Sequence, residues 1–179
     1  MPRIAPLRTA RLSMRPYRND DLDALHGLWT DAAVRRWLWD DQVIDRATAA
    51  AAIQESIDCT ATHGFGHWAV SLHEDETVIG FCGLRLTDGG PEVELLYGLH
   101  PRLWGRGLAS EGAAAWLRAG FEQFGRQRIW ALTDAPNTRS EAVMQRLGMR
   151  FTERFRQANG LDGVRYVITR EEWQHGGRE

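Results

Sequence analysis

The sequence predicts a single α/β domain with a mixed, mostly antiparallel sheet of six to seven strands, flanked by about four helices. Three observations indicate this. The chain has 179 residues, which suits one domain with one sizeable core. Strand-like and helix-like segments follow one another in the order β α α β β β α β α β β. No repeat, linker or low-complexity segment interrupts them, so residues 1–179 are expected to form one domain.

The first strand and helix come from residues 11–30. Residues 11–17 alternate apolar and polar side chains, as a half-buried strand does. Asn19 or Asp20 is expected to cap a helix, because short polar side chains satisfy the free amides of a helix N-terminus. The apolar face of that helix would be Leu22, Leu25, Leu28 and Trp29.

The second helix is expected to begin after Asp45. Residues 35–42, RRWLWDDQ, precede it and follow no clean period. From Asp45 the pattern is helical and alanine-rich, and it is expected to end at Gly64, since glycine commonly ends helices.

The chain from residue 65 onward predicts six strands and two helices. Polar or glycine-rich turns separate three strand-like runs, which favours an antiparallel meander at residues 65–72, 77–86 and 91–99. An alanine-rich helix at 108–124 follows and ends at Gly125. The remaining elements are a strand at 128–134, a helix at 137–149, and strands at 149–157 and 164–170.

Composition excludes several classes of function. The net charge is −2, so no basic surface indicates binding to nucleic acid or to an anionic membrane. All 22 basic residues are Arg, which we interpret as a compositional bias rather than a site. No apolar run is long enough to span a membrane, and the N-terminus lacks the apolar segment of a signal peptide. The expected location is therefore the cytoplasm.

Cysteine and histidine patterns do not indicate a metal site. Cys59 and Cys82 lie in apolar settings at a spacing that matches no metal or redox motif, so they are expected to be reduced core residues. The six histidines are scattered without the spacing of ligand pairs. We expect no metal.

The stretch His100–Gly112, HPRLWGRGLASEG, is the most informative in the chain. It places a Gly-x-Gly turn between a strand and a helix, an arrangement in which free helix amides and the helix dipole attract an anion. Glycine lets the backbone approach a phosphate closely. The stretch is not a P-loop, because GxxxxGK[ST] is absent. It is also a poor dinucleotide fingerprint, because Ser110 replaces the third glycine and a meander precedes it.

Together with two further motifs, this stretch resembles the GNAT superfamily of acyl-CoA-dependent N-acyltransferases. The family hallmark Q/R-x-x-G-x-G/A matches Arg102 to Gly107. The branch of ribosomal-protein N-terminal acetyltransferases carries stretches similar to Glu94–Glu111 and to Asn137–Gly148. The element order is also that of the family. The similarity covers roughly residues 7–166.

The resemblance implies the fold and the residues that hold the donor. It implies a splayed central strand pair that holds acyl-CoA, with acetyl-CoA as cosubstrate. The hallmark begins at Arg102, and the pyrophosphate would bind the amides of Gly105, Arg106, Gly107, Leu108 and Ala109. The pantetheine arm would pair with the strand edge at Tyr97 and Leu99, where a backbone amide could also stabilise the oxyanion. Asn137 and Ser140 would face the thiol end.

Glu94 and Ser140 are the candidate catalytic residues. Glu94 is a carboxylate in an otherwise apolar strand, which is costly unless the group is used or paired. It is a general base, one half of an ion pair with an arginine, or a residue at a solvent-facing edge position. Ser140 is either a donor to the leaving sulfur or a first-turn cap beside Asn137. Many members of the family use a tyrosine as general acid where this chain has Met144.

The acceptor is expected to be a primary amine, with its site near an aromatic cluster. The resemblance places Trp37, Trp39 and Trp68 around the acceptor mouth, and Asp40 could attract a cationic amine. The alternative for these tryptophans, Trp68 above all, is plain core packing. An α-amine costs about 1 kcal/mol to neutralise at pH 7 and a lysine about 4.6 kcal/mol. This difference favours α-amines or other amines of low pKa.

Two classes of function follow from the sequence. The first is an acetyl-CoA-dependent N-acetyltransferase that acts on a protein N-terminus or a small-molecule amine. The second is an acyl-CoA-binding regulatory or interaction module without turnover. The sequence leaves the acceptor, the acyl chain length and formation of a homodimer open.

Overall fold

The computed structural model describes residues 5–73, 75–87, 92–157 and 160–176. Most of the turn predicted at residues 87–90 lies outside the described residues. In this part of the chain the strands are β1 Leu7–Arg8, β2 Leu12–Pro16, β3 His67–Leu72, β4 Asp75–Leu86, β5 Val93–Leu99, β6 Arg128–Asp134, β7 Arg150–Arg156 and β8 Asp162–Thr169. The helices are α1 Leu22–Thr30, α2 Ala32–Arg35, α3 Arg46–His63, α4 Leu108–Glu122, α5 Thr138–Arg146 and α6 Arg170–Gly176.

All eight strands form one sheet in the order β1-β2-β3-β4-β5-β6-β8-β7. The pair β5 and β6 is parallel and every other neighbouring pair is antiparallel, including the predicted meander of β3, β4 and β5. The α/β class and the mixed, mostly antiparallel sheet are therefore confirmed. Helix α4 connects the two parallel strands. Such a crossover is needed because the C-terminal end of β5 and the N-terminal end of β6 lie at opposite ends of the strand pair.

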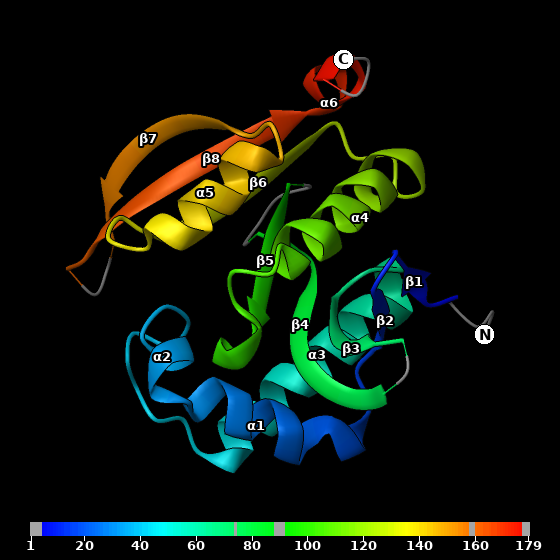
Figure 1. Cartoon of the computed structure of the whole chain (residues 1–179), viewed down its shortest axis with the longest axis vertical. Helices are drawn as coiled ribbons and strands as arrows, with labels where there is room; N and C mark the ends of the chain where they lie inside the picture. The colour runs from blue at the N-terminus through cyan, green and yellow to red at the C-terminus, as the bar shows by residue number, and fades with distance from the viewer. Residues whose placement is uncertain (1–4, 74, 88–91, 158–159, 177–179) are drawn as a thin grey trace.

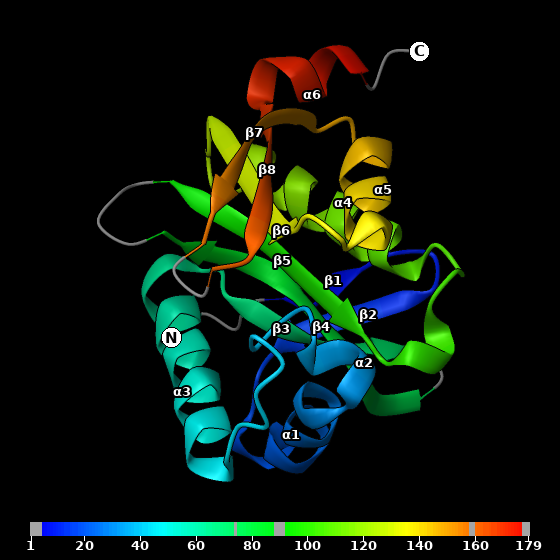
Figure 2. The ribbon, with the colours of Figure 1, turned by 90° about the vertical axis from the view of Figure 1, so that its left-hand side faces the viewer.

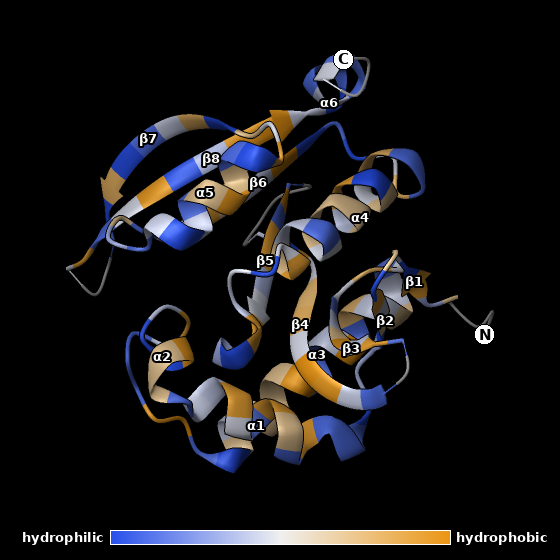
Figure 3. Ribbon diagram, in the orientation of Figure 1, coloured by the Kyte–Doolittle hydropathy of each residue, from blue (hydrophilic) through white to orange (hydrophobic). Residues whose placement is uncertain are grey.

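Helices cover both faces of the sheet, and a separate apolar cluster lies under each layer (Figure 2). Helices α4 and α5 pack on one face through side chains such as Trp116, Phe121 and Met144. Helices α1 and α3 pack on the other through Leu25, Trp29 and others. Edge strand β7 is mostly hydrophilic (Figure 3) and contributes little to either cluster.

Helix boundaries follow the capping residues in most cases. The Asp45 side chain accepts a hydrogen bond from the Thr48 amide, and α3 ends at Gly64, which has a left-handed φ of 80°, as predicted. The cap expected at Asn19 or Asp20 was wrong. Those residues belong to a 3₁₀ turn, and α1 begins after Asp21, whose buried carboxylate accepts from Arg15 and from the Arg18 amide.

The structure contains more elements than the six to seven strands and four helices expected. Strand β1 has two residues, and α2, just before the unpatterned stretch at residues 35–42, has four, so neither is long enough to leave a periodic signal. Helix α6 follows β8 directly. Its start carries a recognisable signal, because Thr169 and Glu172 form a capping box in which the backbone amide of each donates to the side chain of the other.

Cys59 and Cys82 are free thiols, Cys82 being buried. Across the described parts of the chain, no helix combines the length and the hydropathy needed to cross a lipid bilayer.

Candidate active site at the splayed strands β5 and β6

The parallel strands β5 and β6 separate after only two residue pairs. Val93 pairs with Ile129 and Glu94 with Trp130, and no later pair forms between the two strands in the described chain. Beyond these two pairs β5 therefore has an edge inside the sheet that no strand covers, up to Leu99. The splayed central strand pair expected from the resemblance is present.

A cavity of about 600 Å³ occupies this gap. Its lining comes from both faces of the sheet. On the α4/α5 face it includes the glycine turn, the first turn of α4 and residues of α5, and on the α1/α3 face it includes Phe81 and Leu96 together with Val34, Trp37 and Leu38 beyond them. The cavity therefore connects the two sides of the sheet, so two molecules entering from opposite faces could meet beside β5.

The free edge of β5 presents backbone groups to the cavity. The His100 amide donates to the Ile79 carbonyl, so the adjacent Leu99 directs its own N–H and C=O away from β4, as alternate residues of an antiparallel pair do. The same alternation turns the backbone of Tyr97 and Leu95 toward the cavity. An extended ligand could pair with this edge as an added strand. Tyr97 and Leu99, both predicted to bind the donor, line the cavity.

The glycine turn and the start of α4 form one wall of the cavity. Gly105 and Gly107 both have a left-handed φ of 75°, a conformation that glycine adopts without strain. Gly107 is the N-cap of α4 and provides no side chain to its amides, and the first helical bond runs from Glu111 to the Gly107 carbonyl. The amides of Leu108, Ala109 and Ser110 thus have no backbone acceptor among the described residues and suit an anion.

Ser110 also supports an anion site here, although in the sequence it is notable only as the residue that replaces a third glycine. Its hydroxyl is buried, lines the cavity wall and has no hydrogen-bond partner in the described structure. A buried hydroxyl without a partner is costly. A phosphate at the α4 N-terminus would satisfy it, so the residues present fit the expected pyrophosphate.

Arg11, in the bend just before β2, holds the glycine turn in place. Its guanidinium donates to the Arg106 carbonyl at 2.9 Å and pairs with Glu111 at 2.6 Å. Burial raises the pKa of Glu111, but hydrogen bonds from Thr9 and Arg11 outweigh burial, and the pKa lies below its usual value. The Glu111 charge is thereby neutralised by Arg11 instead of facing the anion site.

Two of the predicted donor-binding residues do not line the cavity. Arg102 is exposed in the 3₁₀ turn Pro101–Leu103, and Arg106 is exposed with only its carbonyl held. Arg106 is predicted to bind through its backbone amide, so its exposed side chain does not bear on that prediction, and the cavity lining gives the predicted role of Arg102 no support. Two arginines that the motifs did not single out, Arg139 and Arg146 on α5, do line the cavity, and Arg139 lies over the ring of Trp104 at 5.0 Å.

Ser140 and Asn137 lie together at the start of α5, and the capping role falls to Asn137. Asn137 caps the helix, accepting from the Ser140 amide at 3.3 Å, while its amide group donates to Thr133 at 2.9 Å. The Ser140 hydroxyl is not a cap. It lies 3.0 Å from the phenol oxygen of Tyr97, which reaches across from β5. Burial raises the pKa of Tyr97, so its phenol is neutral near pH 7.

Glu94 lies at the closed end of the gap and is paired. Its carboxylate accepts from Arg85 Nε at 2.8 Å and Nη2 at 2.7 Å, across the β4–β5 ladder. It is not among the described residues that line the cavity. The geometry therefore favours the ion-pair alternative over the general base. The pattern flagged this residue because a buried carboxylate needs a partner, and Arg85 is that partner.

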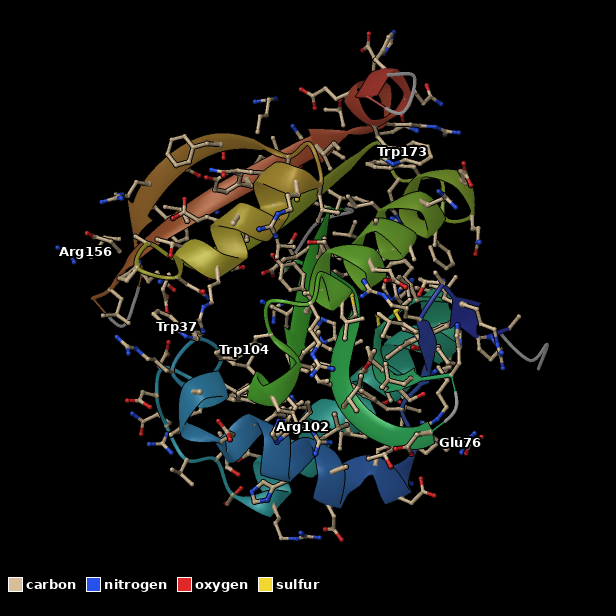
Figure 4. The ribbon with its side chains drawn as sticks, in the orientation of Figure 1. Trp37, Glu76, Arg102, Trp104, Arg156 and Trp173 are labelled. Carbon is tan, nitrogen blue, oxygen red and sulfur yellow. The ribbon has the colours of Figure 1, made fainter. Side chains whose placement is uncertain are left out.

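The predicted acceptor residues divide between the cavity and the core. Trp37 lines the cavity, and Figure 4 shows it between Trp104 and the hairpin end that carries Arg156. Trp68 is 1% exposed, packs edge-on against Trp116 and donates to Thr60, so its assignment to the acceptor site was wrong. Trp39 packs against Trp29 and lines neither cavity nor groove within the described structure.

Asp40 lies in a second, open groove of about 740 Å³ that shares Trp37 with the cavity. This groove runs between the segment after α2 and the β7–β8 hairpin. Asp40 and Asp41 both have left-handed backbones, with φ of 52° and 60°. Such conformations are uncommon outside glycine and cluster at binding sites. Asp134, at the end of β6, also lines the groove.

No group of three or more His, Cys, Asp or Glu side chains that could hold a metal occurs within the described ranges.

Comparison with protein families gives one match that spans most of the chain. A family model described as an acetyltransferase (GNAT) domain matches residues 11–150. Among curated proteins, an uncharacterized N-acetyltransferase p20 from Bacillus licheniformis is 29% identical, over 79% of this chain and 80% of its own. FsC-acetyl coenzyme A-N(2)-transacetylase from Aspergillus fumigatus is 31% identical, over 93% of this chain and 77% of its own.

Solved structures share the fold. An acetyltransferase of the GNAT family from Bacillus anthracis superposes with a TM-score of 0.81 at 24% identity, covering 93% of this chain and 99% of its own. RimL, a ribosomal L7/L12 alpha-N-protein acetyltransferase in complex with coenzyme A, gives a TM-score of 0.79 at 18% identity, covering 92% and 98%.

Proposed function

The chain belongs to the GNAT acetyltransferase family, and from that premise we propose that it transfers the acetyl group of acetyl-CoA directly to a primary amine of low pKa. The observation that carries the proposal is the early separation of β5 from β6, which opens a cavity to both faces of the sheet. Donor and acceptor can then meet beside the backbone groups that β5 turns toward the cavity, without a covalent enzyme intermediate.

The donor occupies the α4 side of this cavity. Its pyrophosphate binds the free amides after Gly107 and the Ser110 hydroxyl. Its pantetheine arm pairs with the edge of β5 at Tyr97 and Leu99. This places the thioester near Tyr97 and Ser140, where a β5 amide stabilises the oxyanion that forms when the amine attacks.

The acceptor enters from the α2 side, past Trp37. The adjoining groove contains Asp40, Asp41, Asp134 and Asp162 beside Arg36, Arg154 and Arg156. Its carboxylates outnumber its guanidinium groups by one, which favours a protonated amine at the mouth. Inside the cavity, the described lining contains no carboxylate and no imidazole. The amine therefore has to arrive neutral, since no lining side chain can take its proton efficiently.

This requirement bears on the acceptor class. At pH 7, about 1 kcal/mol neutralises an α-amine, against about 4.6 kcal/mol for a lysine side chain. Two comparison proteins have names that specify an alpha-N-protein acceptor and an N(2) acceptor. We therefore propose α-amines, of a protein N-terminus or of a small molecule, as the acceptor, and the cytoplasm as the compartment.

Paired peptides test the proposal. One carries a free α-amine and an acetylated lysine, and the other an acetylated N-terminus and a free lysine, in the same sequence. Thiol release from acetyl-CoA is expected with the first at a rate at least tenfold higher, and its kcat/KM should rise with pH toward the pKa of the α-amine. A faster reaction with the lysine peptide would contradict the acceptor assignment.

The second candidate is an acyl-CoA-binding module without turnover. Titration calorimetry with CoA and a broad amine screen separate the two. Binding with turnover supports the enzyme, and binding without turnover on any amine supports the module. Failure to bind CoA overturns both.

A further inference from the structure

The side chain of Tyr97 on β5 reaches Ser140 on α5 beside the cavity. Its phenol oxygen lies 3.0 Å from the Ser140 hydroxyl oxygen and 3.1 Å from the Ser140 carbonyl oxygen. Both residues line the cavity, one from β5 and one from α5. The pair therefore lies where the proposed thioester sulfur would be. At the position where the family resemblance implies a tyrosine acid this chain has Met144, which is 1% exposed, but Tyr97 brings a phenol to the site from another element.

Two hydrogen-bond arrangements are open to this pair, because a phenol has one proton and two acceptors within reach. In the first, Tyr97 donates to the Ser140 carbonyl and the Ser140 hydroxyl donates to Tyr97. In the second, Tyr97 donates to the Ser140 hydroxyl oxygen, and the serine proton is free to point into the cavity. Only a rotation of the two hydroxyl groups separates the arrangements.

We infer that Tyr97 is the positioning residue that turns Ser140 into a hydrogen-bond donor for the leaving thiolate. The inference rests on the proposed acetyltransferase function and on the predicted role of Ser140. In the second arrangement Tyr97 fixes the orientation of the serine hydroxyl. It also polarises that hydroxyl, since an O–H whose oxygen accepts a hydrogen bond is a better donor.

The transfer balances without consuming either residue. A bond forms between the amine nitrogen and the acetyl carbon, and the bond from that carbon to sulfur breaks. The nitrogen loses one proton, which leaves through solvent, and the thiolate takes one proton from solvent after it has formed. Ser140 stabilises the departing thiolate by a hydrogen bond and keeps its proton. Tyr97 keeps its own as well, as its raised pKa favours.

A second tyrosine provides a matched control for a purely structural role. Tyr166 on β8 donates to the Glu141 carboxylate at 2.9 Å, and its phenol oxygen lies 3.3 Å from the Gln145 amide nitrogen. It therefore ties α5 to the sheet through a phenol, as Tyr97 does, but it is not among the described residues that line the cavity. If the Tyr97 hydroxyl serves only to hold α5, removing either hydroxyl should have the same effect.

The test compares Tyr97→Phe, Tyr166→Phe, Ser140→Ala and the Tyr97→Phe/Ser140→Ala double variant. Steady-state kinetics use acetyl-CoA and the best amine found. We expect Tyr97→Phe to lower kcat on the order of tenfold, the rate effect that the loss of one such hydrogen bond usually has. KM for acetyl-CoA should stay within twofold of the wild-type value. Tyr166→Phe should keep kcat within twofold. The double variant should be no slower than Ser140→Ala, because Tyr97 acts through the serine.

Each outcome is decisive. Equal losses in Tyr97→Phe and Tyr166→Phe, or losses that multiply in the double variant, would overturn the inference while the acetyltransferase proposal stands. A Ser140→Ala variant as active as the wild type would overturn it also. Absence of turnover in the wild type would overturn the inference and the proposed function together. A kcat loss confined to Tyr97→Phe and Ser140→Ala, with CoA affinity unchanged by calorimetry, supports it.

Discussion

The indole nitrogen of Trp104 donates a hydrogen bond to the Leu99 carbonyl at 2.7 Å. Leu99 is the last residue of β5, and Trp104 immediately precedes the glycine turn. This bond closes the 3₁₀ turn Pro101–Leu103 back onto the strand, so the backbone edge at Tyr97 and Leu99 and the free amides after Gly107 keep a fixed relation. The two halves of the proposed donor site are joined through one side chain.

Removing this hydrogen bond should weaken donor binding. In Trp104→Phe the aromatic ring remains, but the Leu99 carbonyl loses its donor and the glycine turn loses its tie to β5. We expect KM for acetyl-CoA to rise about three- to tenfold, equivalent to one neutral hydrogen bond, and kcat to stay within twofold. Trp173→Phe is the control, because Trp173 packs on Phe121 and lies far from Trp104 (Figure 4). An unchanged KM in Trp104→Phe would contradict the prediction.

Substitutions of the glycines at the two ends of α4 distinguish the effect of backbone strain on stability from the effect of a changed anion site on CoA binding. Gly107 precedes the helix and Gly125 follows it, with φ of 75° and 63°. An alanine at either position adopts a left-handed backbone at a cost of about 1 kcal/mol. We expect Gly107→Ala and Gly125→Ala to lower the free energy of unfolding similarly, but only Gly107→Ala to raise the Kd for CoA.

Gly107→Glu should have a far larger effect on binding, because its carboxylate would stand among the amides that hold the pyrophosphate. We expect the Kd for CoA to rise at least a hundredfold, while circular dichroism and thermal unfolding show an intact fold. Calorimetric titration measures the affinity. Undiminished binding would mean that Gly105 and Gly107 form only a turn.

Much of the fold was predictable because burial leaves a periodic trace. The strand at residues 128–134 matches β6 at both ends, and Asp45 and Gly64 bound α3 as expected. The short elements were not predictable. Strand β1 and helix α2 have two and four residues, and they owe their existence to pairing with β2 and to the Asp31 cap rather than to any pattern. Asn19 and Asp20 indicated the wrong start for α1. Its start is instead set by the buried Asp21, whose partner Arg15 lies on the preceding strand.

The candidate site also has a part that the sequence predicts and a part that it does not. Backbone features of the donor site could be predicted, because glycines and a helix start mark them directly in the sequence. Side-chain roles could not, because they depend on partners brought together by the sheet. Glu94 on β5 pairs with Arg85 on the neighbouring strand β4, and Ser140 on helix α5 contacts Tyr97 on β5; neither pair has a local signature. Trp68 and Trp37 are the same residue type, and only the fold separates the core residue from the one in the cavity.

The pairing of Glu94 with Arg85 predicts an asymmetric effect on stability. The Glu94 side chain is 5% exposed and that of Arg85 is 54% exposed. Glu94→Gln leaves a neutral amide that still accepts from Arg85, and it should cost about 1 kcal/mol of unfolding free energy. Arg85→Met leaves a buried carboxylate without a partner and should cost about 2 kcal/mol or more. Urea denaturation measures both.

Kinetics of the same variants decide the role of Glu94. As an ion-pair residue, it should change kcat by less than threefold when replaced by Gln. A fall of a hundredfold or more in Glu94→Gln, with stability nearly intact, would restore the carboxylate as a base that acts through water.

His67 makes the folded protein sensitive to mild acid. Its ring lies on β3 beside Phe81, and Nε2 is buried without a partner among the described residues. Burial, assisted by the charge of Arg85, lowers the pKa of His67 from 6.5 to about 3. The unfolded chain therefore binds a proton below pH 6.5 that the folded chain does not accept until about pH 3. Stability is full above pH 6.5 and falls as the pH drops, by about 1.4 kcal/mol for each pH unit.

Replacing the imidazole should remove this loss. In His67→Phe the free energy of unfolding should stay level from pH 7 to about pH 5, and the remaining decline should begin where carboxylates such as Glu111, whose pKa is lowered in the fold, take up protons. Urea denaturation at pH 7, 6 and 5 measures the slope. His175→Gln, at an exposed position on α6, should keep the wild-type slope. A wild-type protein as stable at pH 5 as at pH 7 would show that His67 accepts its proton in the folded state, through a rearrangement that brings Nε2 to solvent.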